Sequence, residues 1–177
     1  TKTTGIDSLL TDKADTTAAA GTSPFLGKML APGQQGAPHV GTFATKDTAA
    51  INGYLKRADI KALLPANLTN IRFAWGKTNE KNPDITDLYA LKGTRDNVAP
   101  LSGGVIVDAK DTFDQMGKPA VSMQMNGNGS RKWEQITGAV SQQGNAIAIV
   151  LDNIVYSAPG VSKGAITGGQ SEISGNF

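Results

Sequence analysis

Apolar and polar residues alternate with a period of two in several short stretches, which is the pattern of strands with one buried face. The alternation is clear in residues 70–76, where Ile71, Phe73 and Trp75 share one side. It returns in residues 86–92, which contain Leu88 and Ala90 on one side. Because a polar loop joins the two stretches, we expect them to pair as an antiparallel hairpin.

Two apolar runs, residues 146–151 and 154–158, flank the pair Asp152-Asn153. Asp and Asn tolerate the positive φ angles that a type I′ hairpin turn requires. We therefore predict two strands joined by a tight two-residue turn. Pro159 is expected to end the second strand or to lie at a sheet edge.

Helical periodicity follows Thr45 and Asp47, either of which can cap a helix. The apolar positions of this helix are Ala50, Ile51, Tyr54 and Leu55. A second turn or short helix should carry Ile60, Leu63 and Leu64 on one side. It is expected to end before Pro65, since the residue preceding a proline is driven out of the helical region.

Residues 118–144 contain the clearest strand-to-helix unit of the chain. Its strand carries Val121, Met123 and Met125 on one side, with Ser122, Gln124 and Asn126 on the other. After the glycines that follow, the period becomes helical, and Trp133, Ile136 and Val140 form one stripe. Asn128 or Ser130 can cap the start of this helix, and Gly144 can end it. We expect the methionine side and the tryptophan stripe to pack together, with Trp133 in the core.

Two more strands are expected, in residues 105–114 and around Ile173. Strands and helices mix without strict β-α-β alternation, which favours an α+β fold with a mixed or antiparallel sheet and a few packed helices. Residues 1–37 are expected to be a loop-rich N-terminal segment that is partly ordered. Residues 38–177 are expected to form the main domain.

Charge and composition exclude several classes of function. The 17 basic and 15 acidic residues leave a formal charge of +2, and no cluster of Lys and Arg stands out in the sequence, so there is no electrostatic case for binding nucleic acid. The chain has no cysteine, which excludes disulfide scaffolds, cysteine nucleophiles and thiolate metal sites. No apolar run approaches the roughly 20 residues of a membrane helix. Because the chain begins at Thr1 without a signal peptide, we expect a soluble piece of a longer protein, and a processed mature protein is the alternative.

The candidates for site chemistry are few. His39 is the only histidine and lies among prolines and glycines, so we expect a solvated loop side chain. Residues 21–29 miss the phosphate-binding P-loop pattern, because five residues separate the glycines and Met29 replaces the required Ser or Thr. Gly127 and Gly129 begin like a dinucleotide fingerprint, but Lys132 stands where the third glycine belongs. A helix amino end there could still hold an anion weakly.

Acidic and glycosylation patterns are equally weak. Asp108, Asp111 and Asp114 have a spacing of three, whereas an EF-hand calcium loop needs a spacing of two, so we expect surface charges. Asn67-Leu-Thr69 and Asn128-Gly-Ser130 are glycosylation triplets that matter only in a eukaryotic secretory setting. We therefore predict no catalytic, cofactor-binding or metal-binding residues, and no enzyme.

The last third of the sequence contains several elements in a fixed order. They are a leading Leu-x-Gly, an Asp-Ala, a Lys-Pro-x-Val strand, a helix with an aromatic residue and a Thr, an Ile-Val-Leu-Asp hairpin, a Ser-Ala-Pro and a closing Ile-Ser-Gly-Asn-Phe. They lie at Leu101, Gly103, Asp108, Ala109, Lys118, Pro119, Val121, Trp133, Thr137, 149–152, 157–159 and 173–177. This ordered set resembles the SecD family, accessory subunits of the bacterial Sec protein-export machinery that are often fused to SecF. Residues 40–92 resemble the longer forms of this domain in fused SecDF proteins of the Bacteroidetes type.

The resemblance implies the head region of the first large periplasmic domain of SecD. It implies a location on the periplasmic side of the bacterial inner membrane, anchored by transmembrane helices outside this sequence. The implied partners are unfolded preprotein, SecF and the SecYEG channel, and the implied role is preprotein contact during translocation driven by the proton gradient. The family's proton-carrying residues lie in membrane helices, so no site residue is carried over and the contact surface stays unassigned.

Two other hypotheses remain open. A generic periplasmic peptide- or glycan-binding module could use Trp75, Trp133 and Tyr156 to stack on a ligand. A hydrolase with a serine nucleophile is the third, but no Gly-x-Ser-x-Gly motif occurs.

Overall fold

The computed structural model describes residues 24–62, 64, 68, 70–94, 96 and 98–174. The chain divides into two compact units at Gly93 and Thr94, and Leu151–Val155 returns to the first unit. Strands and helices are mixed, and the sheets have six and three strands. The predicted α+β class is therefore confirmed.

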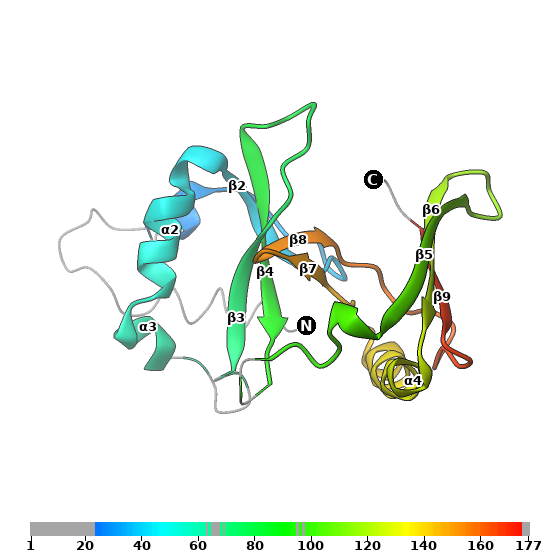
Figure 1. Ribbon diagram of the computed structural model, residues 1–177. Coiled ribbons are helices and arrows are strands. Elements are labelled where there is room, and N and C mark those ends of the chain that lie inside the picture. Colours follow the sequence, from blue (N-terminus) through cyan, green and yellow to red (C-terminus); the bar gives the residue numbers. More distant parts are fainter. Residues whose placement is uncertain are drawn as a thin grey trace. The chain divides into compact units, whose positions relative to one another are not determined.

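The six-stranded sheet has the order β1-β2-β4-β3-β8-β7 (Figure 1). Its strands are β1 (Met29–Pro32), β2 (His39–Ala44), β3 (Ile71–Gly76), β4 (Ile85–Lys92), β7 (Ile149–Leu151) and β8 (Ile154–Ser157). The predicted hairpin is present, since β3 pairs with β4 in antiparallel and brings Trp75 opposite Leu88. On its other side, β3 pairs with β8 in parallel, which makes the sheet mixed.

Helices α2 (Thr48–Leu55) and α3 (Ala58–Ala62) cover one face of the sheet in the first unit (Figure 1). The buried side chains that form the core of helices and sheet are Phe25, Phe43, Ile51, Leu55, Ile60 and Leu88. Trp75 lies edge-on against the Phe43 ring, with 5.8 Å between the ring centroids. Its indole nitrogen donates to the Asn52 side chain at 3.0 Å, so the predicted apolar side of β3 faces this core.

Some predictions for the first unit need correction. The hydrophobic pattern does not predict β1 or β2, because β1 is only four residues long and ends at Pro32, and Gly41 interrupts β2. Asp47 precedes α2, but its carboxylate forms an ion pair with Lys28 and makes no capping hydrogen bond to the helix. Thr45 belongs to a short 3-10 turn, η2 (Thr45–Asp47), which follows another, η1 (Leu26–Lys28). Leu63 and Pro65 lie outside the described residues.

The two-residue turn between β7 and β8 is confirmed. Asp152 and Asn153 have φ angles of 50° and 66°, as a type I′ turn requires. The Asn153 side chain also accepts a hydrogen bond from the Arg72 guanidinium. Val155 on β8 is buried, whereas Leu151 on β7 is exposed.

The second unit is a three-stranded antiparallel sheet, β5-β6-β9, with one long helix (Figure 1). Its elements are η4 (Gly103–Val105), β5 (Ile106–Phe113), β6 (Pro119–Met125), α4 (Gly127–Gln143) and β9 (Gln170–Ser174). Met125, Trp133 and Ile173 are buried, and Trp133 is only 8% exposed. The predicted position of Trp133 in the core is therefore confirmed.

The predicted cap of α4 is wrong, and its predicted end is confirmed. The cap is Asn126, whose side-chain oxygen accepts from the backbone N–H of Gly129 at 2.9 Å. Neither Asn128 nor Ser130 caps the helix, because both already lie inside its first turn. Gly144 ends the helix in the left-handed conformation, with φ at 63°.

Thr137 is the fully buried polar residue of α4, with 0% of its surface exposed. Its hydroxyl donates to the carbonyl of Trp133 at 2.7 Å, one turn earlier in the helix. The same oxygen accepts from the backbone N–H of Ile166 at 2.8 Å. One side chain therefore joins the helix to the irregular segment that precedes β9.

We predict that Asn153→Gly leaves the free energy of unfolding unchanged or raises it slightly, whereas Asn153→Val lowers it by about 1–2 kcal/mol. A β-branched residue resists the left-handed conformation, and glycine adopts it freely. Both substitutions remove the bond to Arg72, so comparing them in urea melts isolates the backbone effect. Equal stabilities of the two variants would contradict the turn assignment.

We predict that Thr137→Val is more destabilising than Thr137→Ser. Valine keeps the shape but leaves the N–H of Ile166 buried without an acceptor, which costs about 1–3 kcal/mol. Serine keeps the hydroxyl and removes one buried methyl group, which costs about 1 kcal/mol. Denaturant melts of both variants test the order, and a larger loss for Thr137→Ser would show that packing of the methyl group dominates.

Candidate functional site

The three-stranded sheet of the second unit has one face covered by α4 and an opposite face that is polar. Directly opposite residues of an antiparallel pair share a face. Lys110 lies opposite Ser122, and Ser122 lies opposite Glu172, so the same face runs across all three strands. The side chains of this face, called the open face below, are Asp108, Lys110, Ser122, Gln124, Gln170 and Glu172.

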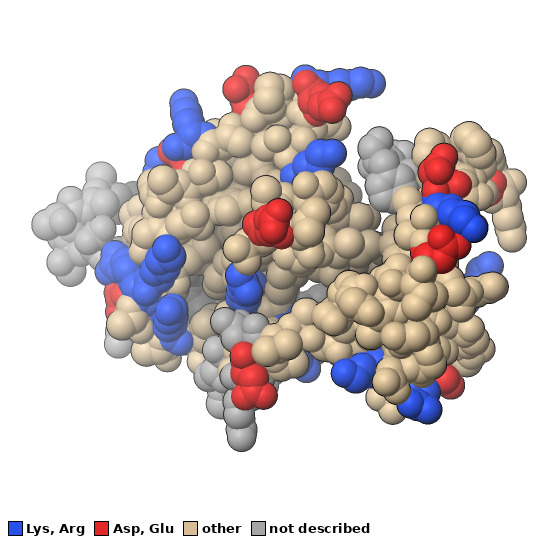
Figure 2. All heavy atoms as spheres, in the orientation of Figure 1, with Lys and Arg blue, Asp and Glu red and all other residues tan. Residues whose placement is uncertain are grey.

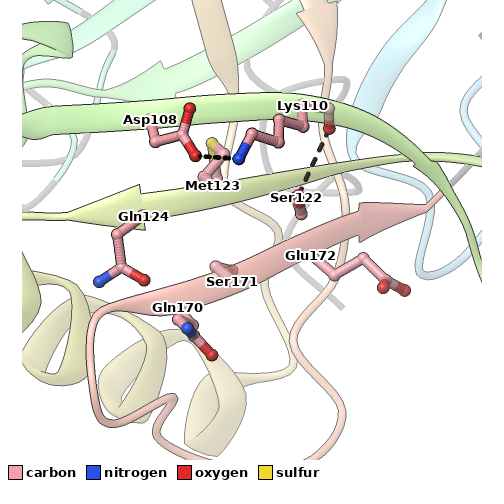
Figure 3. A pocket seen from close by; sticks show the side chains of 8 residues that line it. All are labelled: Asp108, Lys110, Ser122, Met123, Gln124, Gln170, Ser171 and Glu172. Carbon is pink, nitrogen blue, oxygen red and sulfur yellow. Dashed lines mark hydrogen bonds and ion pairs between the residues drawn. The ribbon is translucent and has the colours of Figure 1, made fainter.

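A shallow hollow of about 440 Å³ lies on this sheet. Figure 3 shows the side chains around it. It is lined by Asp108, Lys110, Ser122, Met123, Gln124, Gln170, Ser171 and Glu172. All of these residues belong to β5, β6 or β9, so regular strand pairing positions the whole surface.

The open face carries charges of both signs. The Lys110 ammonium and the Asp108 carboxylate are 2.8 Å apart, with side chains 71% and 52% exposed. The hydrogen bond that Lys110 donates to Asp108, with the attraction of the carboxylate charge, raises the pKa of Lys110. Solvent screens such an exposed pair strongly, so it contributes little to stability and its groups stay available to a partner.

This arrangement presents both hydrogen-bond donors and acceptors. Lys110, Gln124 and Gln170 can donate, and Asp108 and Glu172 can accept. The Ser122 hydroxyl donates to the carbonyl of Lys110 at 3.5 Å, within the sheet. Among the described residues, no group of three His, Asp or Glu side chains could hold a metal ion. The surface therefore suits polar contact with the peptide groups of another chain.

His39 is not the solvated loop side chain that the sequence predicts. It begins strand β2, is half-buried, and pairs with Tyr89 of β4. The two rings meet edge-on with 6.1 Å between centroids. Burial, with a smaller effect of the nearby Asp87 carboxylate, raises the pKa of Tyr89. The imidazole is thus part of the packing of the first unit.

The three spaced aspartates, Asp108, Asp111 and Asp114, do not share one face of the strand. Asp108 lies opposite Gln124, and Asp111 lies opposite Val121, so the two carboxylates are on different faces and both are exposed. Their prediction as surface charges is confirmed. Asp114 instead shapes the β5–β6 turn, where its carboxylate accepts from the backbone N–H groups of Met116 and Lys118 at 2.8 Å each.

The glycines at the start of α4 have a packing role. A Cβ atom added to Gly129 would lie 2.8 Å from the side chain of Val105 and 3.1 Å from Met125, whereas nothing lies within 4 Å of one added to Gly127. Gly129 thus lets the helix approach the sheet closely. Its N–H is also taken by the Asn126 cap, which weakens the case for an anion there.

The remaining motifs have structural roles or fall outside the described residues. Lys28 of the P-loop-like stretch ends the 3-10 turn η1, pairs with Asp47, and is followed by a strand where a P-loop needs a helix. Gly21, Asn67 and Thr69 lie outside the described residues. Asn128 accepts a hydrogen bond from Arg131 on the exposed first turn of α4.

Sequence reasoning does not identify the open face as a site. The sequence feature that corresponds to the open face is the set of polar residues in β6, where Ser122 and Gln124 alternate with the methionines. Such alternating polar residues are typical of any strand with one face in water. Only the pairing of β6 with β5 and β9 shows that the polar sides of the three strands form one surface.

In Figure 2, Lys and Arg atoms gather at the lower left, whereas elsewhere on the visible surface they lie among Asp and Glu atoms. The open face carries both signs, since Lys110 pairs with Asp108. A partner of the open face therefore meets mixed polar groups and not a strong electrostatic field.

No helix among the described residues is long and apolar enough to cross a membrane.

Comparison with known proteins gives one consistent family. Residues 87–177 match the family described as SecDF, P1 head subdomain. Protein translocase subunit SecD of Rhodothermus marinus is 43% identical over 140 residues, which are 76% of this chain and 21% of that protein. Protein translocase subunit SecDF of Thermus thermophilus is 45% identical over 75 residues, which are 42% of this chain and 10% of that protein. The chain thus spans about a fifth or less of the length of these relatives.

Two solved structures are also similar. SecDF in a super-membrane-facing form is 31% identical, with a TM-score of 0.42, over 69% of this chain and 19% of that chain. A structure described as a membrane component SecDF that enhances protein export is 30% identical, with a TM-score of 0.39, over 68% of this chain and 62% of that chain.

We predict that Gly129→Ala destabilises the fold by about 1–3 kcal/mol, because the new methyl group would overlap Val105 in a packed interface. Gly127→Ala is the matched control in the same helical turn, and it should be neutral or stabilising by up to about 1 kcal/mol. Thermal and denaturant melts measure both. Equal effects would mean that Gly129 is not required for close helix packing.

Proposed function

The chain belongs to the SecDF P1 head family, and on that premise we propose that it contacts unfolded preprotein on the outer face of the membrane. The family match confirms the SecD resemblance of the last third of the sequence. The relatives are protein translocase subunits, so the chain is part of a protein-transport system. Within that system, we propose that the whole protein uses the proton gradient to assist translocation.

The open face is the observation that supports preprotein contact. An unfolded chain exposes one N–H and one C=O group per residue, whatever its sequence. Lys110, Gln124, Gln170 and Glu172 offer donors and acceptors to such groups from three neighbouring strands. The hollow between them is open and is lined by polar side chains and by Met123, which suits contact that does not select particular side chains.

Weak binding follows from the same surface. Ordering a disordered partner offsets much of the contact free energy. Asp108 and Lys110 carry opposite charges that solvent screens, so together they attract no charged segment strongly. We therefore propose contact that releases as readily as it forms, as a moving polypeptide requires.

The wider assignments rest on the family. We propose a location on the periplasmic side of the inner membrane, with transmembrane helices in other parts of the protein as its anchor. We propose SecF and the SecYEG channel as partners of the full-length protein, and no enzymatic activity for this domain. The division into a loop-rich segment, residues 1–37, and a head domain, residues 38–177, stays a prediction.

The generic binding module is the weaker hypothesis. Stacking on a glycan needs exposed aromatic rings. Trp75 packs against the core of the first unit, and Trp133 is buried in the second. Tyr156 is exposed, but it is the only one of the three candidates that is.

We predict client-dependent crosslinks from the open face. Photo-crosslinking residues are placed singly at Lys110, Gln124 and Glu172 of the full-length protein, during export of a preprotein stalled by a folded domain at its carboxyl end. Glu134, on the exposed side of α4, is the control position. Adducts with the preprotein should form from the three open-face positions and fade when the preprotein is omitted.

Two results together would overturn the proposal. One is that no position in either unit crosslinks to the stalled preprotein. The other is that deletion of this domain leaves the rate of export unchanged. Adducts from Glu134 as strong as those from the open face would place the contact elsewhere on the domain.

A further inference from the structure

Strand β5 is an edge strand whose outer side has no partner among the described residues. It spans eight residues, Ile106–Phe113, and pairs only with β6 in the three-stranded sheet. Nearly the whole strand is exposed, including Val107 at 62% and Phe113 at 70%. Such an edge leaves a row of backbone N–H and C=O groups free for another strand.

Two backbone hydrogen bonds identify which groups point outward. The backbone N–H of Met125 in β6 donates to the carbonyl of Gly169, next to β9, at 2.8 Å. Because neighbouring residues of a strand point their backbone groups to opposite sides, odd-numbered residues of β6 bond to β9 and even-numbered residues bond to β5. At the hairpin turn, Asp114 donates to the carbonyl of Lys118 at 2.8 Å, which fixes even-numbered residues of β5 as those that bond to β6. Pro119, which has no N–H, correspondingly lies opposite Phe113.

The outward backbone groups of β5 therefore belong to Ala109, Asp111 and Phe113. All three residues are exposed. Together they present three N–H and three C=O groups in the spacing of an antiparallel or parallel ladder. This is a larger continuous edge than that of β1, which has four residues and ends at Pro32.

The side chains of β5 oppose permanent pairing. Asp108, Lys110 and Asp111 place charges on both faces of the strand, and the register shifts between Ile106 and Asp108 as in a β-bulge. Charges and bulges are the usual means by which edge strands avoid aggregation. An edge with this chemistry pairs reversibly with a passing strand and resists stable association.

We propose that the outer edge of β5 receives an extended segment of preprotein as a temporary fourth strand. The segment pairs with the backbone of Ala109, Asp111 and Phe113, and its side chains lie beside those of the open face. This inference rests on the proposed function and names the surface that performs it. Backbone pairing accounts for contact without sequence specificity, because every residue except proline offers the same two groups.

A second copy of the chain is a less suitable occupant. Self-pairing of two antiparallel β5 strands in the register centred on Lys110 would put two ammonium groups directly opposite each other. The register centred on Asp111 would do the same with two carboxylates. Like charges in opposite positions destabilise a strand pair, so a second copy is limited to registers such as the one centred on Ala109, which sets Lys110 opposite Asp108. An unfolded preprotein can slide until its charges fit.

The test separates backbone pairing from side-chain contact. The full-length protein carries a photo-crosslinking residue at Phe113 and engages a stalled preprotein. Asp111→Pro removes the outward N–H and places a ring on the edge, without removing a bond to β6. Asp111→Ala changes the side chain alone. Ser174→Pro makes the same change on the outer edge of β9, since the backbone groups of even-numbered β9 residues point away from β6.

The expected result is a roughly 5- to 10-fold loss of adduct for Asp111→Pro, and a change within about twofold for the other two variants. Thermal melts confirm that each variant is folded. If Asp111→Pro is unfolded, Ala109→Pro replaces it, because its N–H also points outward. An equal loss for Asp111→Ala, an equal loss for Ser174→Pro, or no loss for the β5 proline variants would overturn the proposal.

The failures can be told apart. If the β5 proline variants have no effect while adducts from Gln124 persist, the edge is not used but preprotein contact stands. If no position forms client-dependent adducts, the proposed function falls and the β5 inference with it. Adducts that join two copies of the protein without any preprotein would make a second copy the occupant and overturn the inference.

Discussion

The second unit depends on one buried hydroxyl, that of Thr137. By accepting from the N–H of Ile166, it fixes a segment without regular secondary structure against α4. Ser141 adds a second such bond, since its hydroxyl accepts from the N–H of Gly164 at 3.1 Å. The segment then reaches Gly169, whose carbonyl starts the pairing of β9 with β6. Without these bonds, the third strand would have only its own ladder to position it.

The single helix determines what the rest of the sheet can do. One helix covers one face of a three-stranded sheet, and an antiparallel sheet tolerates water on the other face only if its side chains there are polar. Ser122, Gln124 and Glu172 meet that condition. The open face is therefore a direct result of the fold, and evolution of a contact surface there needs no pocket. Among the described residues, no strand pairs with the outer edge of β5.

Local signals in the sequence predict most of the second unit. Period-two alternation and turn chemistry identify β5, β6 and Gly144, and also the Asp152-Asn153 turn of the first unit, because each depends on neighbours within a few residues. The sequence places the helix cap two or four residues after Asn126, since Asn128 and Ser130 are equally good capping residues by type. The role of Thr137 could not be predicted, because its partner Ile166 is 29 residues away.

Long-range pairing explains the failures in the first unit. Strand β2 has no clean alternation, since a register shift between His39 and Gly41 interrupts its pairing with β4. The parallel pairing of Trp75 with Ile154 joins segments that no local pattern relates. The contact surface is the hardest case, because a solvated strand face and a binding face have the same polar composition. Only the sheet order distinguishes an edge from an interior strand.

The energetics of an added strand favour brief contact. A hydrogen bond between peptide groups contributes about 1 kcal/mol net in water, while ordering the backbone of one residue costs about 1–2 kcal/mol. Pairing along Ala109, Asp111 and Phe113 therefore nearly balances the loss of chain entropy, unless side chains of the incoming segment add contacts on the open face. Contacts of that kind vary from one segment to the next. As a polypeptide moves past β5, successive segments would pair and separate without any of them being held, which is the behaviour that a translocating chain needs.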